Sequence, residues 1–378
     1  MLGFKISMGS FPHHGYLLWM TRKGVRRPKK HKTKSHFVKQ RVEVITNGDL
    51  SIINRELAVQ LAKLSNVEVS VFLLQCSEED RNNAASHDVQ LVVPEMLPGM
   101  NPVDCLMFVP DGHVMDCVVG HGVTLGRQVP VIRKHHQYKW IQVVHTAPED
   151  FGMYKSISQG EQLQKTEVAL CEKADQVVAI GPKLADAYKR YLVCSKKDHN
   201  VLDLTPGIFS EFLDVEQAIE ERRTFSVLII GSGDSWEDFI LKGYDLAARA
   251  IAELEDEIYQ LKFVGAPRGK RDEIAEILLR RGIHHSQLTV CSFNDRREVL
   301  ANLFCEVDLA IMPSRTEEFG VNALEALSAG LPVLVSGNSG FGEALKEVPF
   351  GSECVIDSED PKDWARKIKA VRQKKRSN

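Results

Sequence analysis

The sequence lacks any apolar run as long as the roughly 18 residues that a helix needs to cross a membrane, so no transmembrane helix is expected. It also lacks a convincing secretory signal. Residues 4–20 are mildly apolar, but Pro12 and Gly15 interrupt them, and the basic stretch follows them rather than preceding them. These absences argue against the integral-membrane and secreted classes of protein.

Paired cysteines are missing as well. The eight cysteines are scattered, no two are spaced as C-x-x-C, and Cys291 and Cys305 stand in apolar runs. This distribution argues against a disulfide framework and against a zinc site. We therefore expect buried thiols, a cytoplasmic protein and no bound metal.

Acidic residues are absent from the first 41 positions, which hold eleven lysines and arginines. Since the whole chain carries a net charge of −3, the remainder is acidic. Residues 22–41 could make weak contact with an anionic surface, either a lipid or a nucleic acid. The segment has no helical periodicity and no interleaved aromatic residues, so we favour a disordered extension over residues 1–40 and expect no specific nucleic-acid partner.

The rest of the chain alternates between strand-like and helix-like segments, a pattern typical of parallel α/β sheets with helices on both faces. With 378 residues there is room for two such domains, which we place at 41–215 and 216–378. Strands are expected at 42–46, 67–74, 89–93, 105–109, 117–119, 140–144 and 176–180, then at 225–230, 259–264, 287–291, 307–312 and 331–335. Helices are expected at 53–64, 164–173, from 181 onward, and at 237–254, 270–281, 295–304 and 361–373.

The most informative stretch runs from 313 to 335. It holds two glutamates eight residues apart, Glu317 and Glu325, between the apolar runs 307–312 and 331–335. A loop at the carboxyl end of a buried strand is where open α/β sheets bind ligands, and the N-terminus of the following helix suits a phosphate. Glu325 can accept hydrogen bonds from ribose hydroxyls, and Glu317 can reach a second polyhydroxyl group. The alternative is an ordinary strand, loop and helix with two solvated glutamates.

The block resembles the family-four retaining glycosyltransferases, whose signature is written E-G-F-G-x-x-x-L-E. The matching positions are Glu317, Phe319, Gly320, Leu324 and Glu325. Glu318 departs from it, because the family usually has glycine there. The resemblance implies the GT-B fold, in which two doubly wound Rossmann-like domains face a cleft. It also implies transfer of a sugar from a nucleoside-diphosphate sugar to a hydroxyl acceptor with retention, without a metal or another cofactor.

The same resemblance assigns roles to residues of the second domain. Glu325 would hold the ribose and Glu317 the donor sugar, with Phe319 inside the motif. The backbone amides of Gly320 and Val321, together with Lys242, would hold the diphosphate.

Family members also place an arginine just after the glycine that ends the first strand of this domain. Here Gly231 is followed by Ser232, which brings no charge. Arg315 is our candidate to compensate for the missing cation. Lys242 read without the resemblance would equally be a solvated helix lysine.

Other positions follow from the resemblance less directly. Gly265 ends the strand near the nucleotide base, and Asn294, with Phe293, lies in the next loop of the base pocket. His145 follows a strand of the first domain and matches a position that contacts the donor sugar. A strand-end histidine is also common as a merely satisfied polar residue.

Three further positions are candidates in the first domain. His121 resembles the family's H-G element, and Glu149-Asp150 would face the acceptor. The loop at Asn47-Gly48 lacks the usual glycine pair.

These departures keep a second function open. Ser232, Glu318, the short first loop and the expected absence of a closing C-terminal helix favour a non-catalytic module that binds a nucleotide-sugar or signals. A sugar-nucleotide epimerase is less favoured, because no acid–base pair for it can be located.

Overall fold

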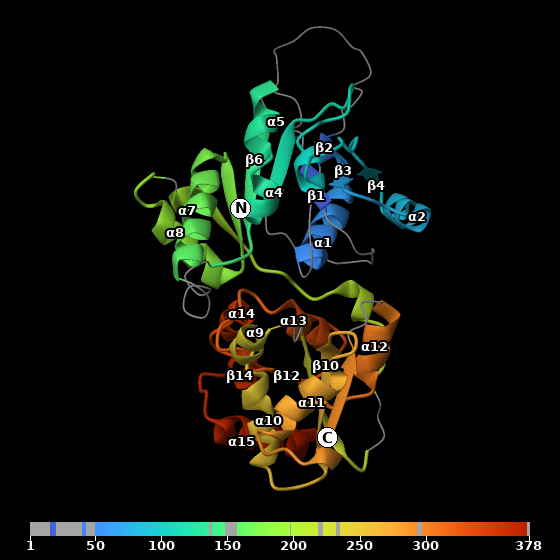
Figure 1. The fold of residues 1–378 in the computed structure, drawn as a ribbon, viewed down its shortest axis with the longest axis vertical. Helices are drawn as coiled ribbons and strands as arrows, with labels where there is room; N and C mark the ends of the chain where they lie inside the picture. The colour runs from blue at the N-terminus through green and yellow to red at the C-terminus, as the bar shows by residue number, and fades with distance from the viewer. Residues whose placement is uncertain are drawn as a thin grey trace. The chain divides into compact units, whose positions relative to one another are not determined.

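The structure is a computed structural model of the chain. It describes residues 16–19, 40–42, 50–135, 138–147, 157–196, 198–217, 222–231, 235–292 and 297–375. The chain divides into two compact units, one holding the first sheet and the other the second (Figure 1). The second unit takes over at Gly207, ahead of the expected boundary between 215 and 216.

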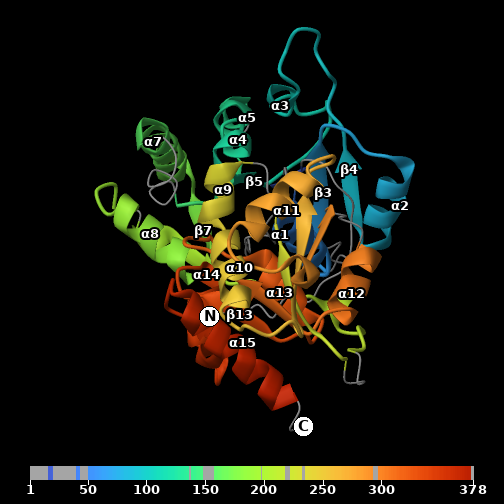
Figure 2. The ribbon, with the colours of Figure 1, turned by 60° about the horizontal axis from the view of Figure 1, so that its bottom comes forward.

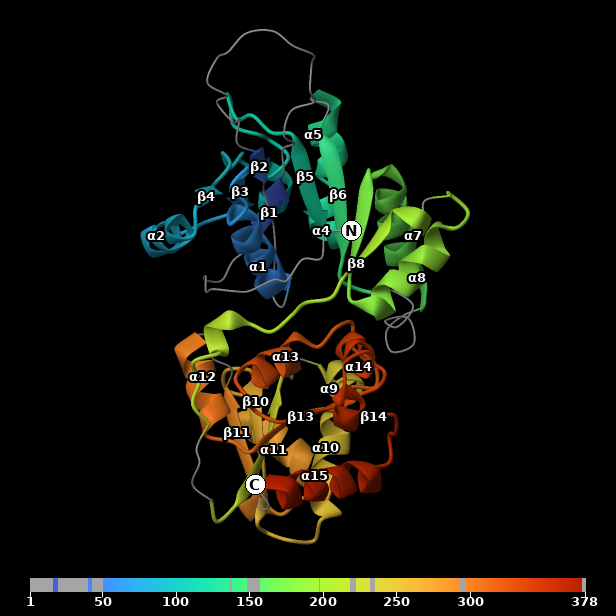
Figure 3. The ribbon, with the colours of Figure 1, turned by 180° about the vertical axis from the view of Figure 1, so that it is seen from behind.

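The first unit is built around a sheet with the strand order β2-β3-β1-β5-β6-β7-β8, in which β4 also pairs with β3 (Figure 3). Its strands are β1 (Tyr16–Trp19), β2 (Gln40–Val42), β3 (Val67–Leu73), β4 (Val89–Val92), β5 (Cys117–His121), β6 (Lys139–Val144), β7 (Gln176–Ile180) and β8 (Val201–Leu204). Its helices are α1 (Leu50–Ala62), α2 (Glu78–Ser86), α3 (Pro102–Cys105), α4 (Gly122–Gly126), α5 (Val129–His135), α7 (Ile157–Lys173), α8 (Pro182–Leu192) and the 3-10 helix η1 (Asp198–Asn200). Most of the expected elements are therefore confirmed.

Three expectations for this unit need comment. Residues Tyr16–Trp19 form β1, which pairs antiparallel with β3 and β5, so this stretch belongs to the sheet and not to an extension. The expected strand at 105–109 is wrong, because Asn101 accepts a hydrogen bond from the amide of Val103 and starts the short helix α3 with a proline at its first turn. The expected strand at 42–46 coincides with β2 only at Val42, and the rest of it lies outside the described residues.

The second unit holds a six-stranded sheet with the order β11-β10-β9-β12-β13-β14, and every printed pair in it is parallel. Its strands are β9 (Phe225–Ile230), β10 (Tyr259–Ala266), β11 (Leu288–Ser292), β12 (Leu309–Met312), β13 (Val333–Ser336) and β14 (Val355–Ile356). Its helices are α9 (Trp236–Leu241), α10 (Tyr244–Ala252), α11 (Arg271–Leu279), α12 (Arg297–Cys305), α13 (Val321–Ser328), α14 (Gly340–Lys346) and α15 (Pro361–Lys375), with 3-10 helices η2 (Ser210–Phe212), η3 (His285–Gln287) and η4 (Gly351–Cys354). Strands numbered along this unit follow the order 3-2-1-4-5-6 of a doubly wound sheet.

The core of the second unit explains why these strands form. Val227, Leu261 and Phe263 are fully buried, as expected for near-continuous apolar strands covered on both faces. On one face α15 packs against α10 (Figure 2). The predicted helix at 361–373 is thus confirmed, and the parallel α/β architecture of the GT-B fold is present in this unit.

One expected helix is wrong in detail. The segment 237–254 is not continuous but breaks between α9 and α10 at Gly243. Gly243 has φ of +68°, and a Cβ there would meet the carbonyl oxygen of Pro313 at 2.0 Å. A side chain is therefore excluded both by conformation and by space. Within the described part of the chain, no helix is long and apolar enough to span a bilayer.

Candidate functional site

The strand order of the second sheet reverses between β9 and β12. Strands on either side of such a switch point send their following loops in opposite directions, which opens a crevice at their carboxyl ends. Gly231 follows β9, and the loop Pro313–Gly320 follows β12. The two segments that the sequence assigned to a diphosphate and a sugar therefore lie at the same switch point.

Lys242 and Glu317 are brought together at this point. The Lys242 Nζ lies 2.7 Å from Glu317 Oε1 and 2.9 Å from Oε2, and Ser314 donates its hydroxyl to Oε2 at 3.1 Å. Lys242 follows α9 directly, and the close approach of its neighbour Gly243 to Pro313 brings the lysine to the loop after β12. The lysine side chain is 29% exposed and that of Glu317 is 12% exposed. Lys242 is therefore an ion-pair partner at the site and not a solvated helix lysine.

Glu318 adds a second carboxyl group beside this pair. Burial and the neighbouring Glu317 raise the pKa of Glu318 to about 7, although Lys242 opposes the shift. For Lys242 burial acts to lower the pKa, but the charges of Glu317 and Glu318 more than offset it and the net shift is upward. Lys242 thus stays protonated at neutral pH, whereas Glu318 holds its proton to a higher pH than an ordinary glutamate.

The backbone at the start of α13 begins with a glycine in the left-handed region. Gly320 precedes the helix with φ of +100°, and Val321 is the first helical residue, so its amide has no partner within the helix. Phe319 is buried, and its ring lies 5.7 Å from that of Phe341. The amide of Phe341 donates to the Phe319 carbonyl at 2.7 Å, which ties the loop to α14.

Gly231 and Gly265 lie at strand ends where neighbouring groups approach too closely for a side chain. A Cβ on Gly265 would meet the Gly231 carbonyl oxygen at 1.6 Å, and one on Gly231 would meet the Tyr244 hydroxyl at 1.8 Å. Both positions are therefore fixed by packing between β9, β10 and α10. Their contacts with a donor stay a prediction.

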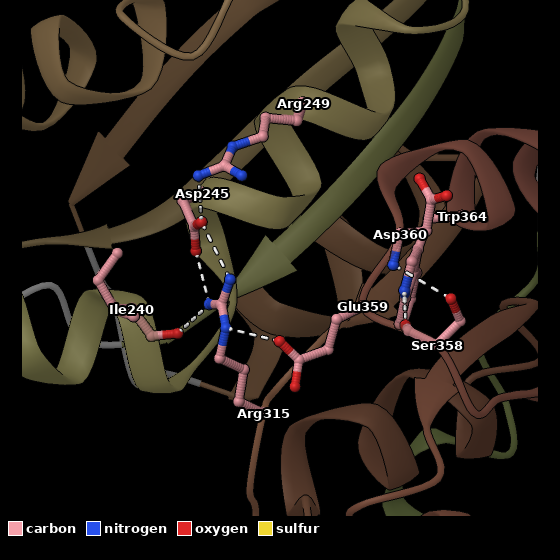
Figure 4. A network of polar contacts seen from close by, with 8 residues as sticks. All are labelled: Ile240, Asp245, Arg249, Arg315, Ser358, Glu359, Asp360 and Trp364. Carbon is pink, nitrogen blue, oxygen red and sulfur yellow. Dashed lines mark hydrogen bonds and ion pairs between the residues drawn. The ribbon is translucent and has the colours of Figure 1, made fainter. Parts of the chain in front are cut away.

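Arg315 is held in a network of its own (Figure 4). Its guanidinium forks onto the buried Asp245, with NH1 2.8 Å from Oδ1 and NH2 3.1 Å from Oδ2. It also donates to the carbonyl of Ile240, and its Nε lies 3.1 Å from Glu359 Oε2. Each donor group of Arg315 thus has a protein acceptor, so binding a diphosphate would require it to leave these partners. The assignment of Arg315 to the donor stays a prediction.

Glu325 lies in the second turn of α13 and is almost completely buried, with its side chain 2% exposed. Arg297, the first residue of α12, donates from NH1 to Glu325 Oε1 and from NH2 to Glu211 Oε1. The carbon Cζ of Arg297 stands 4.9 Å from the ring centre of Phe212. Sequence reasoning missed Arg297 and Glu211, because nothing in their local pattern links 211 to 297.

In the first unit, His121 at the end of β5 and His145 just after β6 form a buried pair. His121 Nδ1 lies 2.9 Å from His145 Nε2, and the rings are stacked with centres 5.2 Å apart. Burial lowers the pKa of His145 to about 3 and that of His121 well below its usual value, the latter with help from His145. Both rings are therefore neutral at pH 7. One ring must donate to the other, so the pair has one N–H and one bare nitrogen left over.

Glu167 on α7 belongs to the same buried region and was not predicted. Thr146 donates to Glu167 Oε2 at 3.4 Å, and the Tyr188 hydroxyl donates to the Thr146 carbonyl at 3.1 Å. Burial raises the pKa of Glu167 to about 7, although hydrogen bonds from Tyr188 and Thr146 oppose the shift. The available signal was its spacing three residues before Leu170 and four before Cys171, which puts a carboxyl on the apolar face of a helix.

A model of the family described as Family 4 Glycosyltransferase in conflict systems matches residues 44–377. The chain belongs to this family. The expected resemblance and the GT-B fold are thus confirmed.

Among related sequences, a D-inositol 3-phosphate glycosyltransferase of Corynebacterium urealyticum is 23% identical over 84% of this chain and 81% of its own length. One of Geodermatophilus obscurus is 34% identical over 35% of this chain and 30% of its own. That match therefore spans about a third of the relative's length.

Among solved structures, the sucrose-phosphate synthase of Thermosynechococcus elongatus has a TM-score of 0.64 at 18% identity, covering 88% of this chain and 89% of its own. HepE of Anabaena in complex with UDP and glucose has a TM-score of 0.62 at 15% identity, covering 84% and 86%. At such low identity these likenesses support the fold.

Several candidate positions of the chain fall in segments that the structure does not describe. The predictions for the base pocket, for the first loop, for the acceptor side and for the missing arginine position lie outside the described residues: Asn294, Phe293, Asn47, Gly48, Glu149, Asp150 and Ser232. Within the described part of the chain, no group of three or more His, Cys, Asp and Glu side chains is arranged to hold a metal ion.

Proposed function

We propose that this family-four glycosyltransferase moves a sugar from a nucleoside-diphosphate sugar to a hydroxyl acceptor, with retention at the anomeric carbon. The observation that carries the proposal is the convergence of Lys242 and Glu317 at the switch point of a doubly wound sheet, next to the start of α13. A cation and helix amides without a partner in the helix suit the diphosphate of such a donor, and a carboxylate beside them suits the hydroxyl groups of its sugar.

In this reaction the bond between the anomeric carbon and the diphosphate oxygen breaks, a bond to the acceptor oxygen forms, and the proton of the acceptor hydroxyl passes to the leaving diphosphate or to solvent. The diphosphate gains negative charge as it leaves. Lys242 and the amides of Gly320 and Val321 would stabilise that charge, as fixed donors do for developing oxyanions. Glu317 would exchange part of its contact with Lys242 for hydroxyl groups of the sugar.

Glu325 would accept hydrogen bonds from the ribose. His145 stays assigned to the donor sugar by the family resemblance. Because burial holds its pKa near 3, it would act as a neutral hydrogen-bonding group and not as a proton donor at pH 7.

We further propose that the enzyme works in the cytoplasm without a metal cofactor. Its partners would be the nucleotide-sugar and a hydroxyl acceptor, with the basic residues 22–41 available for weak contact with an anionic surface. UDP is the natural first probe, since HepE of Anabaena is similar in fold and its structure holds UDP.

The test is turnover of a panel of nucleoside-diphosphate sugars, measured as release of the nucleoside diphosphate with and without simple hydroxyl acceptors. We expect one donor to be consumed by the native enzyme and not by Glu317→Gln. Binding of a donor with no turnover under any condition would instead favour the non-catalytic module.

Position 232 holds a serine where family members have an arginine, and a substitution there distinguishes an enzyme from a non-catalytic module. In a weakened enzyme, Ser232→Arg would restore a cation for the leaving group and raise turnover. In a non-catalytic module it would change binding alone. If neither changed, the diphosphate would not lie near Gly231.

A further inference from the structure

We propose that Arg297 is a positioning residue that holds Glu325 in place for the ribose of the donor, with Glu211 and Phe212 anchoring it from behind. We call these four residues the Arg297 cluster. The inference rests on the proposed function, because it concerns the same nucleotide. It goes beyond that proposal by naming which residues of the chain determine whether ribose is distinguished from deoxyribose.

The first step is the division of labour within the guanidinium group. NH1 of Arg297 donates to Glu325, whereas NH2 donates to Glu211, so the two carboxylates do not compete for one donor. The planar group also lies over the Phe212 ring, with Cζ 4.9 Å from its centre. A guanidinium fixed from one side and stacked on an aromatic ring loses little freedom when it contacts a second carboxylate.

The second step is the charge at Glu325. Its side chain is only 2% exposed, and removing the partner of a buried charge is strongly destabilising because the charge is left uncompensated. Arg297 itself is 14% exposed. Burial acts to lower its pKa, but Glu325 and Glu211 raise it, so Arg297 remains a cation in this place.

The third step asks whether Arg297 orients Glu325 or occupies the ribose site until a nucleotide displaces it. An arginine of the second kind would need to give up its contacts readily when the ribose binds. Arg297 instead has two further contacts, with Glu211 and with Phe212, neither of which involves Glu325. A carboxylate has about four lone-pair directions, so the bond from NH1 of Arg297 to Oε1 does not by itself exclude a ribose hydroxyl from Glu325.

The charge balance also limits which nucleotides fit. Two carboxylates and one guanidinium leave the cluster with one net negative charge. A nucleotide with a phosphate on its 2′- or 3′-oxygen would be repelled, whereas neutral hydroxyl groups are accepted. The cluster therefore favours an unmodified ribose.

The experiment is calorimetric titration of the native protein with UDP, GDP and ADP, followed by the 2′-deoxy and 3′-deoxy forms of whichever binds most tightly. The native protein should lose roughly tenfold to a hundredfold in affinity when the hydroxyl facing Glu325 is removed, as for a hydrogen bond to a charged group. Arg297→Met should bind the ribonucleotide about as weakly as the native protein binds the deoxy form, and should no longer distinguish the two. Arg297→Lys, which keeps the charge without the fork, should retain part of the discrimination.

Two further variants separate this role from a structural one. Glu211→Gln keeps an acceptor for NH2, should fold, and should lower the discrimination by a few fold. Arg222→Met is the matched control, because Arg222 pairs with Asp308 and with the carbonyl of Cys305 at the opposite end of α12. It removes a partly buried cation from the same unit, and the discrimination should stay native.

Other outcomes would overturn the inference. Tighter binding of the ribonucleotide by Arg297→Met would mean that Arg297 blocks the ribose site. Unchanged discrimination in Arg297→Met and Glu211→Gln would mean that the cluster is structural. If the native protein binds a nucleotide but ignores its ribose hydroxyls, this inference fails while the proposed donor class stands. If the native protein binds no nucleoside diphosphate, both fail.

Discussion

The buried polar clusters described above differ between the two units: the one in the first unit is built on two neutral histidines, and those in the second unit are built on ion pairs. The first unit holds two neutral histidines and a glutamate whose pKa is raised to about 7. The second holds three ion-paired sites, built on Lys242, Arg297 and Arg315. Under the proposed function, Lys242 would meet the leaving diphosphate, whereas the neutral histidines would hydrogen-bond a sugar that carries no charge. The following experiments break or sharpen this contrast.

The largest expected effect concerns Arg315. In Arg315→Met the buried Asp245, 1% exposed, loses its bidentate partner, so the free energy of unfolding of the second unit should fall by about 3–5 kcal/mol. Chemical denaturation measures it. Arg249→Met is the control, because Arg249 also contacts Asp245 but is 44% exposed, and it should cost under about 1 kcal/mol. If Arg315→Met had native stability but no longer bound the donor, Arg315 would instead be a ligand of the diphosphate.

Lys242→Met should act on turnover. It removes the cation nearest to the predicted leaving group and should lower kcat by about 10²–10³, as for the loss of one oxyanion-stabilising donor. Steady-state kinetics on the donor identified by the panel would measure it. A rise in KM at constant kcat would show that Lys242 binds the donor without assisting departure of the diphosphate.

Glu167→Gln tests the neutral character of the first unit. With a folded pKa of about 7 against an ordinary value of 4.5, Glu167 binds more protons in the native than in the unfolded state between those values. Its contribution to stability is therefore present below pH 4.5 and is lost as the pH rises through 7. The stability of Glu167→Gln relative to the native protein should increase by on the order of 3 kcal/mol from pH 4.5 to pH 8.

The contribution of the buried histidines to stability changes with pH in the opposite direction. The folded pKa of His145 is lowered to about 3, so its contribution is present above about pH 6.5 and is lost as the pH falls toward 3. Glu167→Gln lacks the titration of Glu167. Its free energy of unfolding, measured at several pH values, should therefore show the loss of the histidine contribution at low pH. A pH-independent difference between Glu167→Gln and the native protein would mean that Glu167 is solvated.

The smallest effect is expected at Glu318. Because its pKa is raised to about 7, it gains negative charge beside Lys242 as the pH rises through neutrality. Donor affinity of the native protein should then fall by about threefold to tenfold between pH 6 and pH 8.5, in keeping with a partly screened charge near a surface. Glu318→Gln should flatten this profile. An equally steep profile in that variant would place the titrating group elsewhere.

The sequence predicted the second unit well because its signals are local. Each apolar strand is recognisable within a few residues, and the spacing of Glu317 and Glu325 lies within one strand–loop–helix segment. The break at Gly243 was missed because its cause is the backbone of Pro313, 70 positions later, which no periodicity reveals. The short helix at 102–105 was missed because the apolar run at 105–109, which begins at its last residue, suits a strand as well.

The site was predicted in part for the same reason. Lys242 and Glu317 were named separately, and only the fold brings their side chains to 2.7 Å. Arg297 and Glu211 come from elements far apart in the chain, and their chemistry arises only where α12 and η2 meet α13. Glu167 was hidden on an apolar helix face, where a carboxyl group is unusual and its partners come from two other segments.

The most direct test of the account is nucleotide-sugar binding at Glu325. Thermal-shift titrations of the native protein, Glu325→Ala and the remote surface control Glu353→Ala would use one panel of nucleoside diphosphates and their sugars. We predict that one sugar nucleotide stabilises the native protein and the control, and that the shift is lost in Glu325→Ala. Equal stabilisation of Glu325→Ala, or no stabilisation of a folded native sample by any sugar nucleotide, would contradict it.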